Sequence, residues 1–323
     1  MTFILTNELE RYARKALPAP AGQFAISVLE HVREGRFQRS LSLIVAATGA
    51  ATGLEVGYEH YKGSYSNPVM YTPIVLSGSL VTGGLMGFFS RRAAQTVLRI
   101  SSMLTLADGI IGVGFHIRGI ARKPGGWRLP VTNIVMGPPI FAPLLFGTSA
   151  YLGLMASYLR REEDPSDAGL QQVSAEQGAA IEKKSDWRAD IAQGKFQKHL
   201  AAITFAWALF SGFEALYSHY KSNFRYKAQW TPVLLTPVLM AAAAWAMRSR
   251  RAANTFLPAA SALALADGAA GFFYHARGIL CRPGGVKKIS YNILYGPPIF
   301  APLLFAACGF LGILASLLRR EGK

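Results

Sequence analysis

The chain has few charged residues and few cysteines, and these shortages exclude several classes of protein. Charged residues make up 16% of the 323 residues, whereas about a quarter is usual in soluble domains. The two cysteines, Cys281 and Cys308, have no counterparts in the internal repeat described below, so neither a disulfide nor a cysteine metal site is predicted. The sequence also lacks a glycine-rich phosphate loop and a nucleophile elbow. We expect no cleavable signal peptide, because the charged N-terminal segment has no apolar core.

Apolar residues and positive charge are abundant instead. Hydrophobic residues make up 51% of the chain, and the formal net charge is +16. The lysines and arginines occur in short clusters between long apolar runs rather than along one face. This pattern is typical of a polytopic membrane protein in contact with a lipid bilayer, where basic residues mark the loops. Nucleic-acid binding is not indicated.

The sequence contains an internal duplication. Residues 37–162 recur as 196–321 at a constant offset of 159 without a gap, and about 56 of the 126 aligned positions are identical. Such self-similarity indicates a repeat architecture. Because the apolar residues of the two copies have diverged freely, the polar residues kept in both become the candidates for function.

Each copy contains four apolar stretches of about 20 residues, enough to cross a bilayer. They lie near 41–59, 71–89, 97–117 and 133–159, and near 200–218, 230–247, 256–276 and 292–318. We therefore predict an all-α integral membrane protein with eight transmembrane helices, arranged as two tandem, parallel four-helix bundles. The predicted segments are an amphipathic preface (1–35), a first repeat (36–162), a cytoplasmic linker (163–195) and a second repeat (196–323). A repeated Gly-Pro-Pro-Ile-Phe-Ala-Pro motif, at 137–143 and 296–302, predicts a kinked or broken entry to each fourth span.

The distribution of basic residues predicts the orientation. Arginine clusters flank the spans on the side of the two termini, which we place in the cytoplasm, with the chain in the inner membrane. The opposite side is also basic, against the usual rule. Its residues include Lys62, Arg118, Arg122, Lys123, Arg128, Lys221, Arg277, Arg282, Lys287 and Lys288. This departure calls for a functional reason.

Five polar pairs survive in both copies and form the candidate site. They are Glu55/Glu214, His60/His219, Asp108/Asp267, His116/His275 and Arg118/Arg277. The two histidines of a copy each lie about 28 Å along their spans, near the outer interface. The glutamates and aspartates lie deeper, where an ionisable group costs at least about 2.5–3.5 kcal/mol.

The first hypothesis is that each copy binds one haem b. His60 and His116, and likewise His219 and His275, would be the two axial ligands, since the first and third helices of a bundle lie diagonally across its core. Glycines at 109, 112, 268 and 271 would give the flat ring a smooth surface. Arg118 and Arg277 would bind the propionates. Two such haems would make an electron-transfer module between an extracytoplasmic donor and the quinone pool, as a subunit of an oxidoreductase. The basic outer surface would dock an acidic or redox partner.

Three other interpretations remain open. The histidines, together with Glu55, Asp108, Glu214 and Asp267, could bind iron, manganese or zinc directly, as in a membrane enzyme of the oxidase or hydroxylase type. The same carboxylates could form the ion or proton path of a transporter. Finally, all of these residues could simply make buried hydrogen bonds between helices.

Overall fold

The computed structural model describes residues 18–170 and 186–321. Residues 1–17 of the amphipathic preface and residues 171–185 of the linker lie outside the described residues. The helices of the first copy and the segment before it are α2 (Ala19–Arg33), α3 (Gln38–Lys62), η1 (Pro68–Tyr71), α4 (Thr72–Phe89), α5 (Arg91–Ala93), the π turn η2 (Ala94–Leu98), α6 (Arg99–Ala121), η3 (Gly126–Arg128), α7 (Pro130–Val135) and α8 (Ala142–Ala156). Those that follow are α10 (Trp187–Ala192), α11 (Gln197–Lys221), η4 (Lys227–Trp230), α12 (Thr231–Arg248), α13 (Arg250–Asn254), α14 (Phe256–Leu280), η5 (Gly285–Lys288), α15 (Ile289–Tyr295) and α16 (Ala301–Leu317).

Long apolar helices dominate the described part of the chain, as expected for a multi-pass membrane protein. Six helical segments are long and apolar enough to cross a membrane: 38–62, 68–89, 91–121, 197–221, 227–248 and 250–280. The fourth apolar stretch of each copy is broken near its start, as its prolines predicted, so no single helix runs through 133–159 or 292–318. The chain forms the short helix α7 or α15, then an irregular segment, and then α8 or α16, which have 15 and 17 residues. The three prolines of the repeated motif explain this break, because proline cannot continue a helical hydrogen-bond ladder.

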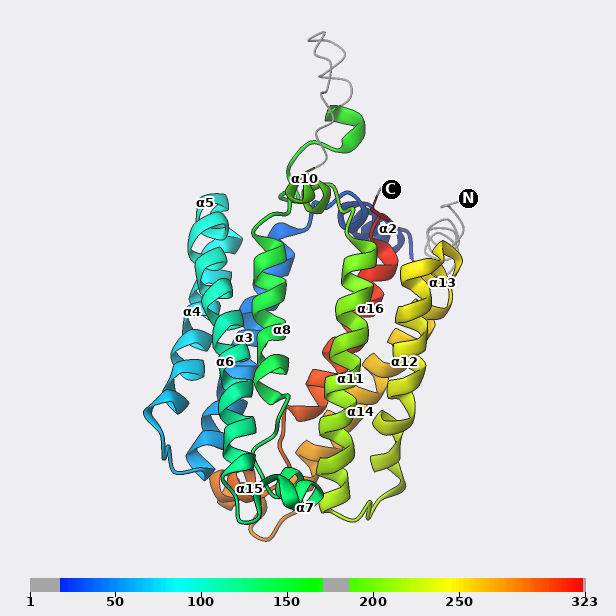
Figure 1. Ribbon diagram of the computed structural model, residues 1–323. Coiled ribbons are helices and arrows are strands. Elements are labelled where there is room, and N and C mark those ends of the chain that lie inside the picture. Colours follow the sequence, from blue (N-terminus) through cyan, green and yellow to red (C-terminus); the bar gives the residue numbers. More distant parts are fainter. Residues whose placement is uncertain (1–17, 171–185, 322–323) are drawn as a thin grey trace.

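In each half, four helices pack around a common axis. Helix α3 packs along α4 and α8, and α6 also packs along α4 and α8, so α3 and α6 occupy opposite corners. In the second half α11 and α14 are likewise separated by α12 and α16. The two groups lie side by side with their long helices roughly parallel (Figure 1). Short α7 and α15 lie together at the end opposite the described chain ends (Figure 1).

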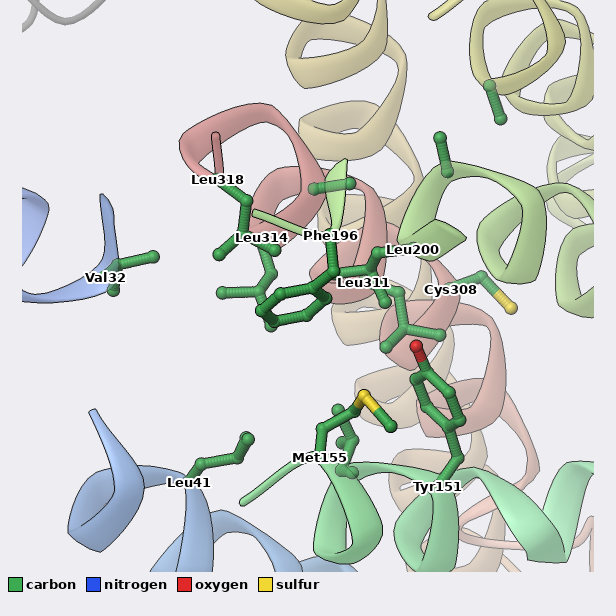
Figure 2. Close-up of a cluster of buried hydrophobic side chains, with 14 of the residues drawn as sticks. Val32, Leu41, Tyr151, Met155, Phe196, Leu200, Cys308, Leu311, Leu314 and Leu318 are labelled. Carbon is green, nitrogen blue, oxygen red and sulfur yellow. The ribbon is translucent and has the colours of Figure 1, made fainter. Parts of the chain in front are cut away.

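A continuous apolar core joins the two halves. It includes Leu41 of α3, Met155 of α8, Leu200 of α11 and Leu311 of α16, which all lie in one cluster of buried side chains (Figure 2). The outer faces of α4, α6, α12 and α14 instead expose large apolar residues, among them Val75, Ile110, Leu234 and Phe273. Such faces suit contact with lipid rather than water.

Close helix packing depends on small residues at particular positions. On α4, a Cβ atom added to Gly84 would lie 2.6 Å from the Ser42 carbonyl oxygen of α3, whereas one added to Gly78 would meet nothing within 4 Å. Gly84 therefore lets the backbones of α3 and α4 approach each other.

Replacing Gly84 with alanine is expected to destabilise the fold by about 1–3 kcal/mol, because the contacting atom is backbone and cannot move aside. The matched variant Gly78→Ala, on the same helix, should be neutral or slightly stabilising. Thermal unfolding of both variants in detergent measures the difference. Equal melting temperatures for the two variants would contradict this account of the packing.

Charged side chains close the bundle at the end that carries α10. Asp167, just before the undescribed part of the linker, binds Arg160 at 2.6 Å and also binds Arg319. These arginines are equivalent in the two copies, so one carboxylate ties the ends of both halves together. Burial tends to raise the pKa of Asp167, but hydrogen bonds from Arg319 and Arg160 outweigh this and hold the pKa below its ordinary value.

The variant Asp167→Asn is expected to lower the stability of the protein by about 1 kcal/mol at neutral pH. Since the folded state lowers the pKa, this contribution is complete above the unfolded pKa, about 3.9, and is lost as the pH falls through the folded value. The gap in melting temperature between the wild type and the variant should therefore close below about pH 4. The more exposed Glu163 serves as a control, and Glu163→Gln should change stability less. A gap that stays constant down to pH 3 would refute the assignment.

Candidate functional site

All four duplicated histidines lie at the end of the molecule that carries α7 and α15. His60 is two residues from the end of α3, and His116 is five residues from the end of α6. Their imidazoles are close enough to interact electrostatically, as are those of His219 and His275. The structure therefore brings the two predicted histidines of each half near each other, from helices at opposite corners. All four rings are partly buried.

Each of these histidines makes the same type of hydrogen bond. Nδ1 of His60 lies 2.7 Å from the carbonyl oxygen of Met70, and Nδ1 of His219 lies 2.8 Å from that of Gln229. The Nδ1 atoms of the other two rings face the carbonyl oxygens of the broken segments, Pro139 for His116 and Pro298 for His275, the latter at 2.6 Å.

These bonds determine which ring nitrogen carries the proton. A carbonyl oxygen can only accept a hydrogen bond, so Nδ1 must be the donor and a neutral ring keeps a lone pair on Nε2. Within residues 18–170 and 186–321, no hydrogen bond occupies Nε2 of any of the four rings. An imidazole that donates Nδ1–H to a backbone carbonyl and offers Nε2 has the arrangement that metal-ligating histidines usually have.

An unusual turn holds the first histidine of each half. Ser64 and Tyr65 have φ values of 58° and 46°, and the corresponding pair in the second half, Asn223 and Phe224, has 56° and 46°. Left-handed backbone at ordinary residues is strained and persists only where surrounding contacts hold it. Here aromatic stacking holds it, with ring centroids 4.3 Å apart between Tyr65 and Tyr71.

The aromatic residue of this turn also touches the histidine. Tyr65 meets His60 edge-on at 6.3 Å, and Phe224 meets His219 at the same distance. Phe224 stacks on Trp230 at 3.9 Å. Comparison of the two copies missed these residues, because Tyr65 and Phe224 differ while their aromatic character and geometry are the same.

Buried asparagines of α7 and α15 hold the loops that lead from α6 and α14 into these short helices. Asn133 donates its side-chain amide to the carbonyl oxygens of Pro124 and Gly126, at 3.1 and 2.7 Å. Asn292 makes the equivalent contacts in the second half. Both were overlooked in the sequence, although their identity in the two copies was a signal that could have found them.

Gly109 and Gly112 do not border a flat cofactor surface, contrary to expectation. A Cβ atom at Gly109 would lie 2.7 Å from the carbonyl oxygen of Pro143, and one at Gly112 would lie 2.8 Å from the Pro143 Cβ. Gly268 and Gly271 approach Pro302 in the same way. These glycines let α8 and α16 start close against α6 and α14, so their conservation between the copies reflects helix packing.

The duplicated aspartates tie neighbouring helices together. Asp108 on α6 receives a hydrogen bond of 2.6 Å from the hydroxyl of Thr72, the first residue of α4. Asp267 holds the equivalent place on α14, where it interacts with Thr231 at the start of α12 and with His219.

The duplicated glutamates reach from one half into the other. Glu55 of α3 accepts the backbone N–H of Phe300 at 3.1 Å, directly before α16. Glu214 of α11 accepts that of Phe141 at 2.7 Å, directly before α8. A tyrosine one helical turn further on, Tyr58 or Tyr217, donates its hydroxyl to the same carboxylate. Each glutamate thus satisfies the start of a helix that would otherwise leave free N–H groups inside the bilayer.

The predicted quartet of Glu, His, Asp and His therefore does not form one compact metal centre. Among the described residues, no group of three or more His, Cys, Asp or Glu side chains is arranged to hold a metal ion. What remains at each site is a pair of imidazoles. In comparisons with known proteins, no family model, no curated protein and no solved structure matches this chain.

The end of the molecule that carries the histidines is strongly basic. Arg118 and Arg277, each two residues beyond a histidine, are exposed. Arg225 and Lys227 add to the ten basic residues named above, whereas Glu59 is the sole acidic residue among residues 56–75, 112–142, 215–235 and 271–300, all described. Glu59 forms an ion pair with Lys62, with Oε1 and Nζ 3.1 Å apart, so most of the positive charge at this end has no acidic partner there.

The histidine geometry makes a spectroscopic prediction. Nitrogen-15 NMR of histidine-labelled protein should show His60, His116, His219 and His275 as neutral rings protonated on Nδ1 at pH 8, because each Nδ1 faces a carbonyl oxygen. Most free neutral imidazoles are protonated on Nε2 instead. His31 and His199, which make no Nδ1–carbonyl bond within the described residues, provide internal comparison. Signals of the Nε2–H form at the four duplicated positions would contradict the geometry.

Proposed function

We propose that this chain is an integral membrane electron-transfer subunit that carries two b-type haems, one in each half. In this proposal α8 and α16 also cross the membrane, together with the irregular segments that precede them. The chain then has eight membrane-crossing segments in two parallel repeats. Both termini lie in the cytoplasm, and the histidine end faces the other side. Electrons pass between an extracytoplasmic donor and the quinone pool.

The proposal rests on one observation, that the histidines have the same hydrogen-bond arrangement in both halves. In each half, two imidazoles from helices at opposite corners interact electrostatically. Each gives Nδ1–H to a backbone carbonyl and keeps a lone pair on Nε2. Two imidazoles of this kind could hold a haem b, which would supply one-electron chemistry when bound. His60 and His116 would hold one haem, and His219 and His275 the other.

Several neighbouring residues suit this cofactor. Exposed Arg118 and Arg277 stand beside the second histidines and can pair with propionate groups at the membrane edge. The excess of positive charge at this end favours the approach of an acidic donor protein and would accelerate its association. Propionate binding and docking of an acidic donor would together explain why the loops on this side are so basic.

The alternatives fit the geometry less well. A direct site for iron, manganese or zinc would need further ligands, but Glu55 and Glu214 already hold helix starts, and Asp108 already binds Thr72. A transport path through the carboxylates would need them to exchange partners, and both glutamates are already satisfied by backbone N–H and tyrosine donors.

The test is a visible spectrum of the purified protein, oxidised and then reduced with dithionite, beside quantification of haem. We expect a sharp reduced α-band and two haems per chain. His60→Ala should remove one haem, and His60→Ala with His219→Ala should remove both, because each haem would lose an axial ligand.

His199→Ala is the matched control, because His199 stacks on Tyr151 at the opposite end and should leave both haems in place. Absence of haem in protein expressed with adequate haem supply would refute the proposal. Bound stoichiometric iron, manganese or zinc without haem would instead favour a direct metal site.

A further inference from the structure

One irregular segment connects a glutamate of the first half to a histidine of the second. Glu55 Oε2 accepts the N–H of Phe300 at 3.1 Å. Two residues earlier in the same segment, the carbonyl oxygen of Pro298 accepts Nδ1–H of His275 at 2.6 Å. The two hydrogen bonds thus end on backbone atoms of one short stretch, residues 298–300.

The reverse connection has the same construction. Glu214 of the second half accepts the N–H of Phe141 at 2.7 Å, and Pro139, two residues earlier, accepts Nδ1–H of His116 in the first half. Rings of the two halves also meet here, since Phe141 stacks on Phe210 with centroids 4.6 Å apart. Each half therefore holds the segment that orients a histidine of the other.

The stretch between these contacts is short and begins with a proline. The pyrrolidine ring fixes φ of Pro298, and a single residue, Ile299, separates Pro298 from Phe300. A displacement of Phe300 is therefore expected to move the carbonyl of Pro298 as well.

We propose that Glu55 and Glu214 are positioning residues that act across the halves: Glu55 sets the orientation of His275, and Glu214 sets that of His116. The proposal rests on the proposed haem function, because it assigns each redox centre a controlling residue in the opposite half. The state of one centre then depends on the packing of the other half, so the two are coupled.

The alternative is that each glutamate affects only the histidine on its own helix. Glu55 lies five residues before His60 on the same helix, and Glu214 has the same relation to His219. If the glutamates acted only through their own helices, Glu55 would influence the first-half centre and Glu214 the second. The two roles therefore predict effects in opposite halves.

Single-centre proteins separate these predictions. The variant His60→Ala keeps only the second-half centre, and His219→Ala keeps only the first. We expect Glu55→Ala to shift the midpoint potential and the reduced spectrum of the centre in the His60→Ala protein, and to leave the centre in the His219→Ala protein unchanged. Glu214→Ala should give the mirror result.

A conservative variant tests whether the acceptor matters. In Glu55→Gln the amide oxygen can still accept the N–H of Phe300, so the potential should return most of the way to that of the parent. Glu55→Asp is too short to reach and should behave like Glu55→Ala, while disturbing packing less if the alanine variant folds poorly. Glu163→Ala, at the end of the molecule that carries α10, is the control and should change neither centre.

Hydrogen exchange provides a readout that needs no cofactor. Loss of the Glu55 acceptor should speed exchange of the amides at residues 299–301 by about tenfold or more, since a hydrogen bond to a charged group is lost, and should leave residues 140–142 unaffected. Glu214→Ala should do the reverse. If the exchange rates change in this way but the wild-type protein contains no haem, the proposed function is refuted, whereas the positioning role of the glutamates across the halves is supported.

Two results would overturn the inference. One is an effect of Glu55→Ala on the first-half centre equal to or larger than its effect on the second. The other is unchanged exchange at residues 299–301 in Glu55→Ala, which would mean that the carboxylate does not hold the segment at all.

Discussion

The structure depends on one constraint, that backbone groups freed inside a bilayer must find partners within the protein. Each fourth apolar stretch is broken by prolines, which leaves carbonyl oxygens before the break and N–H groups after it unsatisfied. The carbonyls of Pro139 and Pro298 are satisfied by histidines of their own half. The N–H groups of Phe141 and Phe300 are satisfied by glutamates of the other half. The need to satisfy one irregular segment thus brings together all three features of the site, namely histidine orientation, buried acids and contact between halves.

This arrangement gives the duplicated polar residues distinct roles. The histidines have Nε2 atoms that no described residue occupies, whereas the aspartates join neighbouring helices through Thr72 and Thr231. The glutamates join the halves. A polar residue that is identical in both copies is therefore not necessarily involved in catalysis or ligand binding. A residue that forms a needed hydrogen bond with backbone groups inside a membrane is kept in both copies as well.

The two ends of the molecule handle charge differently. At the end with α10, arginines are matched by carboxylates, as where Asp167 binds Arg160 and Arg319 together. At the histidine end, Glu59 alone opposes many exposed lysines and arginines. Matched charges hold the halves together, and unmatched charges create a field that extends beyond the surface and favours an anionic partner.

The sequence by itself determined that the chain is an all-helical membrane protein, where its long helices run, and which polar residues recur in both copies. These follow from local apolar length and from residue identity in two aligned copies. Only the tertiary structure decided what the other polar residues do. The partner of Glu55 is Phe300, 245 positions away, and no spacing within one copy can reveal a contact made with the other. The role of Gly109 was misjudged for a related reason, since a glycine can admit either a ligand or a neighbouring helix, and only the position of Pro143 distinguishes them. Similarly, Tyr65 and Phe224 differ in identity but share a place in the turn, and this equivalence is visible in backbone geometry alone.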